Sequence, residues 1–219
     1  MRKISQLLSI IFHPLTIPTY VLLILLWINP YIFGVNSAKD HLIFIFLVVI
    51  STLILPGLSV AMMLFTGLIK SIHSEDNRDR IGPFIAALIF YLWMYINFKS
   101  NPDVPLAYSF FILGSIIAMS LAFVINVFMK ISLHTLAMGG VCAMALLIYY
   151  YFSYQTIGMQ IPLLGSREVN IGILVIFIVL LSGIVGTARL FLKAHKPVEI
   201  YSGYILGFLS MMTAFKLVF

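Results

Sequence analysis

Nine residues in three short segments of the chain have side chains suited to chemistry on a phosphate group. In chain order they are Lys70, Arg78, Arg80, Lys130, Ser132, His134, Arg189, His195 and Glu199. Arginine side chains bind phosphate oxygens in a bidentate manner. A pair of histidines can supply a nucleophile and a general acid, and a carboxylate can set the tautomer of the nucleophile. The set therefore predicts phosphoryl transfer.

Carboxylates are too few around these segments to build a magnesium site. Glu75, Asp76 and Asp79 all fall in one loop, whereas Mg²⁺ sites gather oxygen ligands from several directions. The single cysteine, Cys142, lies in an apolar run and has no zinc-ligand spacing around it. We therefore expect metal-free chemistry, with no metal site and no cofactor.

The third segment places a proline between its histidine and its carboxylate. Pro197 fits the first turn of a helix but not its interior, so the last helix is expected to begin near Lys196. Glu199 would then lie near the third helical position, where its carboxylate can reach back toward His195. The same carboxylate could instead cap the helix, and the spacing leaves both roles open.

The composition indicates whether water or lipid surrounds the protein that carries these residues. Of the 219 residues, 62% are hydrophobic and only 9% are charged, whereas soluble domains carry about 25% charged residues. The net charge of +6 is not gathered into the clustered basic groove that a nucleic-acid backbone requires, so no nucleic-acid partner is expected. The chain is predicted to be a multi-pass integral membrane protein, with membrane lipids as its surroundings.

Seven stretches approach the length of about 20 apolar residues that a transmembrane helix needs. They are residues 7–33, 42–69, 81–98, 106–129, 135–154, 170–192 and 198–218. We expect an all-α bundle of six to seven transmembrane helices, forming one domain over residues 1–219. Residues 4–12 are expected to lie along the membrane interface, and Pro56 is expected to kink the second span.

The order of the spans brings the three segments to one face of the membrane. Two spans separate the first segment from the second, and two more separate the second from the third. Because an even number of crossings returns the chain to the same side, all three can converge. Ionisable residues at membrane depth are costly and need partners or a wet cavity, so such a cluster marks a candidate site. His13, His41 and His73 match no pattern and are interpreted as interfacial.

At these residues the chain resembles the type 2 phosphatidic acid phosphatase (PAP2) superfamily of membrane-embedded lipid phosphatases. The third motif of that family is Ser-Arg, five residues, His, three residues, Asp. The corresponding residues here are Ala188, Arg189, His195 and Glu199, at the same spacing.

The other two family motifs match less closely. The second, Pro-Ser-Gly-His, keeps its serine and histidine as Ser132 and His134. The first, Lys, six residues, Arg-Pro, has only a loose counterpart in Lys70, Arg78, Arg80 and Pro83. The resemblance covers roughly residues 70–210 and implies a PAP2-like fold around that motif-bearing core.

The resemblance also implies a role for each residue. His195 would attack the phosphorus and form a phosphohistidine, Glu199 would orient it, and His134 would protonate the leaving alkoxide and later activate water. The phosphoryl oxygens would be held by a larger set of residues, namely Arg189, Arg80, Arg78, Ser132, Lys130 and Lys70. The implied substrate is a lipid phosphate or diphosphate.

Three departures from the family pattern stand out: Leu133 replaces a glycine, Ala188 a serine and Glu199 an aspartate. None removes the nucleophile or the acid, so activity is expected. A lipid phosphotransferase using the same histidine, a non-catalytic membrane subunit and a transporter are the alternatives. The charges at span ends count against a transporter.

The sequence says less about which membrane holds the protein and which face of that membrane carries the site. The expected location is the bacterial inner (cytoplasmic) membrane. Lys/Arg counts place the clusters on the cytoplasmic side, since Arg2, Lys3, Lys70, Lys193 and Lys196 outnumber Lys39, Lys99 and Arg167. The PAP2 family usually works on the opposite face, so the sequence leaves the face open, and it specifies no oligomeric state.

Overall fold

Helices form the framework of the computed structural model, which describes residues 2–28, 41–71, 78–152, 156–161 and 165–219. They are α1 (Arg2–Ile11), α2 (Ile17–Ile28), α3 (Leu42–Val49), α4 (Leu55–Phe65), α5 (Ile81–Phe98), α6 (Leu106–Ile125), α7 (Leu133–Leu147), α8 (Ile171–Phe191) and α9 (Pro197–Val218). A 3-10 turn (Arg78–Arg80) precedes α5, and π-helical turns occupy Ile50–Ile54 and Ile148–Phe152.

Six helical segments in the described part of the chain are long and apolar enough to cross a membrane. They are Leu42–Phe65, Arg78–Phe98, Leu106–Ile125, Leu133–Phe152, Ile171–Phe191 and Pro197–Val218. The shorter apolar helix α2 precedes them. The expected polytopic helical bundle of six to seven spans is therefore confirmed at this level.

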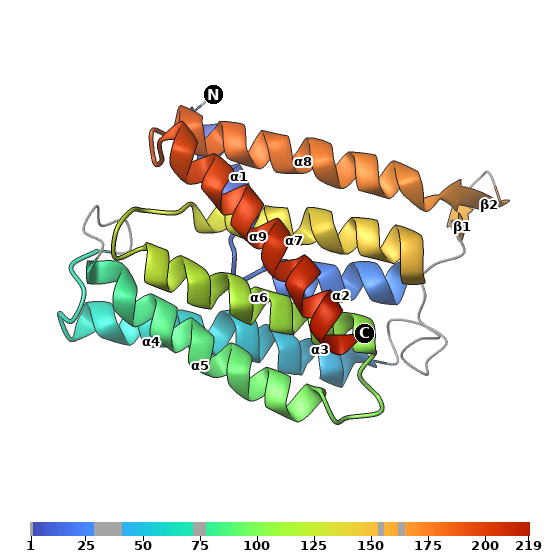
Figure 1. Ribbon diagram of the computed structural model, residues 1–219, viewed down its shortest axis with the longest axis horizontal. Helices are drawn as coiled ribbons and strands as arrows, with labels where there is room; N and C mark the ends of the chain where they lie inside the picture. Colours follow the sequence, from blue (N-terminus) through green and yellow to red (C-terminus); the bar gives the residue numbers. More distant parts are fainter. Residues whose placement is uncertain (1, 29–40, 72–77, 153–155, 162–164) are drawn as a thin grey trace.

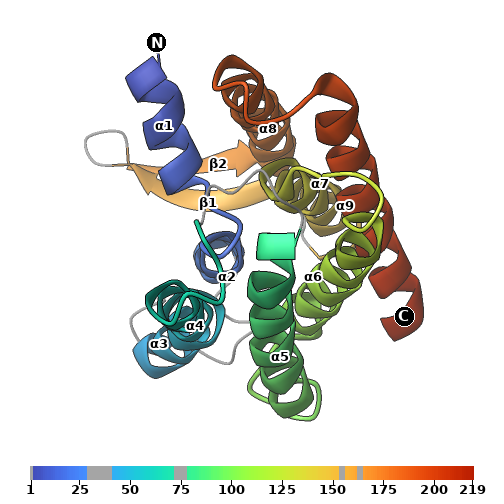
Figure 2. The ribbon, with the colours of Figure 1, turned by 90° about the vertical axis from the view of Figure 1, so that its left-hand side faces the viewer.

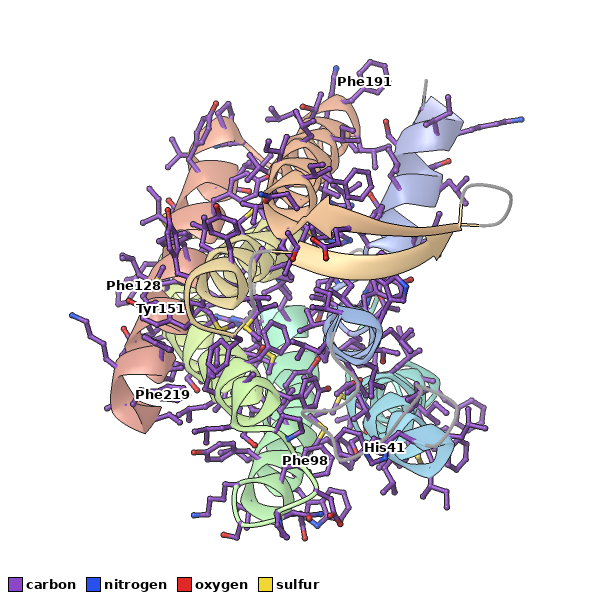
Figure 3. The ribbon with its side chains drawn as sticks, turned by 90° about the vertical axis from the view of Figure 1, so that its right-hand side faces the viewer. His41, Phe98, Phe128, Tyr151, Phe191 and Phe219 are labelled. Carbon is purple, nitrogen blue, oxygen red and sulfur yellow. The ribbon has the colours of Figure 1, made fainter. Side chains whose placement is uncertain are left out.

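The outer surface of the bundle is apolar. On α8, Ile176, Phe177 and Leu180 are each about 60% exposed, at 62, 59 and 63%. Figure 3 shows side chains made mostly of carbon projecting outward around the helices. Such a surface is unfavourable in water and suits the hydrocarbon of a bilayer.

Two departures from regular helix lie close to prolines that the sequence analysis singled out or that end the first helix. Residues 2–11 form the separate helix α1, which ends just before Pro14. Figure 2 shows α1 lengthwise where α2 is seen end-on, so α1 lies across the bundle direction. In the second span, the π-helical turn Ile50–Ile54 directly precedes Pro56, which has no N–H to continue the regular ladder.

A short β-hairpin was not predicted. No strand is expected between the predicted spans 135–154 and 170–192, but β1 (Thr156–Ile161) pairs antiparallel with β2 (Gly165–Asn170). Gly158 faces Glu168 in the register. The hairpin joins the π-helical turn after α7 to α8, and it satisfies backbone polar groups by pairing them with each other. It lies at the end of the bundle away from the N-terminus (Figure 1).

Glycines bring α9 into close contact with α7. A Cβ atom on Gly207 would meet the carbonyl oxygen of Leu136, and one on Gly203 would lie 2.9 Å from the carbonyl oxygen of Ser132. Small residues allow such backbone approach between membrane helices. As a result, the N-terminal ends of α7 and α9 lie beside each other.

Candidate active site

The three predicted segments meet at one end of the bundle. Figure 1 shows the α4–α5, α6–α7 and α8–α9 connections at the same end. Arg80 Nη2 donates to the Ile131 carbonyl oxygen at 2.9 Å, and the Ser132 amide donates to the Glu199 carbonyl oxygen at 3.2 Å. These two hydrogen bonds join all three segments, so the convergence predicted from the parity of the spans is present in the structure.

His195 and Glu199 form a close pair between α8 and α9. His195 Nδ1 lies 2.7 Å from Glu199 Oε2, and the two side chains are 10% and 14% exposed. The same carboxylate oxygen accepts a bond from the Lys196 amide at 3.3 Å. The helix begins at Pro197, as predicted. Glu199 therefore has both of the roles that the sequence left open. Its carboxylate orients His195 and also caps the first turn of α9.

The surroundings of His195 favour its neutral form. Burial lowers the pKa of His195 below its usual 6.5, and the nearby charge of Arg189 acts in the same direction. The hydrogen bond to Glu199 raises this pKa but does not outweigh the burial. With Nδ1 on the carboxylate, Nε2 of a neutral imidazole carries the free lone pair. This is the protonation state that a nucleophile needs.

Two buried guanidinium groups have unused donors. Nη1 of Arg80 and Nε of Arg189 are shielded from solvent and find no hydrogen-bond partner among the described residues. Arg80 also lies over the ring of Phe84, with its Cζ 5.6 Å from the centroid. Buried donors without partners are costly and rare in native proteins. They are therefore suited to an anion with several oxygens.

His134 is held by the N-terminal helix. Its Nε2 lies 2.9 Å from the carbonyl oxygen of Ser9, and Nη1 of Arg189 donates to the Ser9 hydroxyl at 3.1 Å. The ring of His13 meets that of His134 edge-on, with centroids 5.7 Å apart. Burial, together with the charge of Arg189, lowers the pKa of His13 below 6.5.

A cavity of about 660 Å³ connects this cluster to the interior of the bundle. Its charged and histidine lining residues are His13, Asp79, Arg80, Lys130, His134, Arg189, Lys193 and His195. Its apolar lining includes Val60, Ala87, Tyr91, Phe111, Ala118, Leu136 and Met211. Arg80, just before α5, and Tyr91 within it are eleven residue steps apart, which corresponds to roughly 16 Å of helical rise. The cavity thus joins a basic mouth to a deep apolar interior.

Four predicted phosphate ligands differ in their placement. Lys130 lines the cavity, whereas Lys70 and Arg78 are exposed and do not line it. The Ser132 side chain is completely buried outside the cavity lining, and its hydroxyl oxygen has no hydrogen-bond partner in the described structure. Phosphate binding by these four residues stays a prediction. The position of Lys130 in the cavity lining fits that prediction best.

Sequence reasoning missed several residues of the site. His13 was interpreted as interfacial but lines the cavity, and Ser9 was not considered. Lys193 adopts a left-handed backbone (φ 53°) and also lines the cavity. The Pro-containing break after α1, which turns the chain back toward the bundle, is the one signal that could have pointed to His13. His41 lies at the opposite end of the bundle, near Phe98 (Figure 3), and His73 is outside the described residues.

Within the described ranges, no three His, Cys, Asp or Glu side chains gather closely enough to hold a metal ion. Glu75 and Asp76 lie outside those ranges.

Comparison with protein-family models, with curated proteins and with solved structures gives no match to this chain. The site is therefore interpreted from its own geometry.

Proposed function

We propose that this protein is a metal-independent phosphatase of the PAP2 kind, which removes phosphate from a membrane lipid phosphate or diphosphate through a phosphohistidine. The observation that carries the proposal is the His195–Glu199 pair at 2.7 Å, beside two half-buried arginines that each have a buried, unpartnered donor, at the mouth of a largely apolar cavity. We also propose that the protein lies in the bacterial inner membrane.

The proposed reaction begins with attack by Nε2 of His195 on phosphorus. The bond between phosphorus and the lipid oxygen breaks, and its electron pair leaves with that oxygen, which takes a proton from His134. Water then loses a proton to His134 and attacks the phosphohistidine. The P–N bond breaks, its electrons return to Nε2, and inorganic phosphate departs. His134 regains the proton it gave up, so the cycle closes without a metal or cofactor.

Positive charge around the site supports the binding and transition-state steps. Arg80 and Arg189 offer guanidinium donors, and Lys130 and Lys193 line the same cavity. Helices α5, α7 and α9 all begin at this end of the bundle, so their positive dipole ends face the site. Preorganised donors of this kind stabilise the charge that spreads over phosphoryl oxygens during transfer.

The apolar interior of the cavity supports a lipid as the source of the phosphate. Helices α2, α4, α5, α6, α7 and α9 supply the apolar lining, and Tyr91 and Met211 lie deep in their helices. A free sugar phosphate or nucleotide would leave this lining without a partner. A lipid chain can occupy it and gain free energy from the apolar contact.

The decisive experiment measures phosphate release from a panel of lipid phosphates and diphosphates in detergent with EDTA present. Wild-type protein is expected to release phosphate, and His195→Ala is expected to lose the activity. His41→Ala is the matched control, because it removes a histidine at the opposite end of the bundle. A radiolabelled phosphate bound to protein, stable in base and labile in acid, would identify the phosphohistidine.

Other outcomes would contradict the proposal. Release that EDTA abolishes, or that His195→Ala retains, would rule out the metal-free phosphohistidine route. Transfer of label to an added lipid alcohol in place of water would favour the phosphotransferase. A folded protein that is inactive on every lipid and forms no labelled intermediate would favour a non-catalytic subunit.

A further inference from the structure

The N-terminal helix α1 turns its two serines toward the protein and large apolar side chains outward. Ser5 is buried, whereas Ile4, Leu7 and Ile10 are 62, 56 and 71% exposed. A helix held to a water-soluble protein by burial of apolar side chains would show the reverse pattern. Here the apolar side suits the membrane interface, and α1 packs on α8 with its serines facing inward. Polar contacts therefore connect α1 to the site.

The hydrogen-bond directions around Ser9 follow from donor and acceptor chemistry. The Ser9 hydroxyl donates its only proton to the Ser5 carbonyl oxygen at 2.9 Å, so toward Arg189 it can only accept. The Ser9 carbonyl oxygen also can only accept, so the Nε2 of His134 that faces it at 2.9 Å must carry a proton. Nδ1 of His134 is therefore the ring nitrogen that can exchange a proton with a substrate or with water.

We infer that Ser9 is a positioning residue of the site. Its carbonyl orients His134 in the way that Glu199 orients His195, and its hydroxyl holds one arm of the Arg189 guanidinium. This inference rests on the proposed function, since it assigns the partner of the proposed general acid. In the reaction above, the proton on Nε2 stays on the Ser9 carbonyl throughout. When the anionic phosphate binds, the neutral His134 takes up a second proton from solvent at Nδ1. That second proton passes to the leaving oxygen and is replaced by one from water.

The partner of His134 is a backbone carbonyl, which is uncharged, and this affects how readily His134 releases a proton. A carbonyl fixes the ring and its tautomer without adding a negative charge beside His134. A full carboxylate there would hold the transferable proton more strongly and would repel the phosphate. The two histidines thus receive different partners: a charged one for the nucleophile, and a neutral one for the group that must release a proton.

The carbonyl can be tested by replacing one backbone amide with an ester. Placing the α-hydroxy analogue of isoleucine at Ile10 turns the Ser9 carbonyl into an ester carbonyl, which is a weaker acceptor. We expect kcat to fall about tenfold with little change in KM. The matched control is the corresponding ester at Leu8, which also removes one helical N–H but weakens the carbonyl of Leu7. Equal effects of the two esters would overturn the inference.

A spectroscopic readout separates this inference from the proposed function. The imidazole ¹⁵N shifts of labelled protein, with the His134 signals identified by their loss in His134→Gln, report which ring nitrogen carries the proton. We expect the neutral His134 to be protonated at Nε2, and the Ile10 ester to populate the other tautomer. Protonation at Nδ1 in the unmodified protein would overturn the inference even if the enzyme is active. Protonation at Nε2 in an inactive protein would leave the inference standing while the proposed function fails.

The hydroxyl of Ser9 is tested by side-chain exchange. Ser9→Ala removes the acceptor for Arg189, and we expect KM for a lipid phosphate to rise about fivefold with kcat nearly unchanged. Ser9→Thr keeps a hydroxyl and is expected to restore KM. Thermal unfolding of both variants in detergent controls for a purely structural effect. A KM unchanged in Ser9→Ala, or not restored in Ser9→Thr, would overturn the role of the hydroxyl.

Discussion

At the scale of single residues, the site depends on what each histidine hydrogen-bonds. His195 has a carboxylate at 2.7 Å on Nδ1, and His134 has a carbonyl oxygen at 2.9 Å on Nε2. Each contact leaves the other ring nitrogen for chemistry. The proposed roles of nucleophile and proton carrier therefore have a structural basis in the partners, since the two imidazoles are chemically identical.

The lowered pKa of His195 predicts the acid side of the pH profile. The proposed nucleophile must be neutral, and its neutral fraction falls as the pH drops through its pKa. Because burial brings this pKa below 6.5, kcat/KM is expected to hold at pH 6.5 and to decline only at more acidic pH. The check is kcat/KM for a lipid phosphate between pH 4.5 and 8, with stability measured in parallel. A decline centred above pH 6.5 would contradict it.

Glu199→Gln tests the charge of the orienting group. The amide keeps nearly the same shape but cannot stabilise a positive imidazole, so kcat is expected to fall roughly 10²-fold or more. Because the interaction with Glu199 raises the pKa of His195, its loss should move the acid limb to still lower pH. Kinetics across the same pH range measure both effects. An acid limb that moves upward would show that Glu199 acts on another group.

At the scale of secondary-structure elements, the contact between α7 and α9 positions the chemistry. Gly203 and Gly207 allow the backbones to touch, and the Ser132 amide then bonds to the Glu199 carbonyl oxygen at 3.2 Å. This contact places the His134 end of α7 beside the Glu199 end of α9. The prediction that α9 begins at Pro197 was right because proline chemistry is local. The packing of α9 against α7 could not be predicted, because the two helices are far apart in the sequence.

Gly207→Ala is expected to weaken this helix pair. Its new Cβ would lie against the Leu136 carbonyl oxygen and 3.0 Å from the Gly140 amide nitrogen, and the backbones would have to separate. Overpacking of this kind costs roughly 1–3 kcal/mol. We expect a lower unfolding temperature in detergent and reduced activity.

Gly183→Ala in α8 is the matched control for that substitution. A Cβ at Gly183 meets nothing within 4 Å, so stability should stay the same or rise. Equal losses in both variants would indicate a general sensitivity of helical glycines and would contradict a specific role for the α7–α9 contact.

At the scale of the whole molecule, the cavity sets what the site can bind. Six helices contribute to its apolar lining, and the basic residues gather where α5, α7 and α9 begin. A headgroup phosphate at the mouth would therefore extend its chain between the helices. The outer surface of the bundle is apolar as well, which suits lipid around the protein.

Ala87→Phe is expected to shorten the chain that the cavity accepts. Ala87 lines the cavity from α5, and the added ring would occupy part of the apolar interior. Activity on long-chain lipid phosphates should fall about tenfold, while activity on a short-chain phosphate should change little. Ala86→Phe is the matched control, because Ala86 is equally buried in the same helix but does not line the cavity. The same chain-length profile in both variants would contradict the assignment.

Sequence by itself determined the helical membrane architecture and most of the chemistry-bearing residues. Apolar runs of about 20 residues can only satisfy their backbone in lipid as helices, so the spans follow from composition. The parity of the crossings then brings Arg80, His134 and His195 to one end. The His195–Glu199 pair follows from local spacing and from Pro197.

Tertiary structure alone decided how those residues are partnered. Ser9 is 125 residues from His134 and 180 from Arg189, so no local spacing could reveal their contacts. The same holds for His13 in the cavity and for the exposure of Lys70 and Arg78. Local patterns specify helices and caps because their interactions span a few residues. Which side chains meet in a site depends on helix packing, which is settled only when the whole bundle forms.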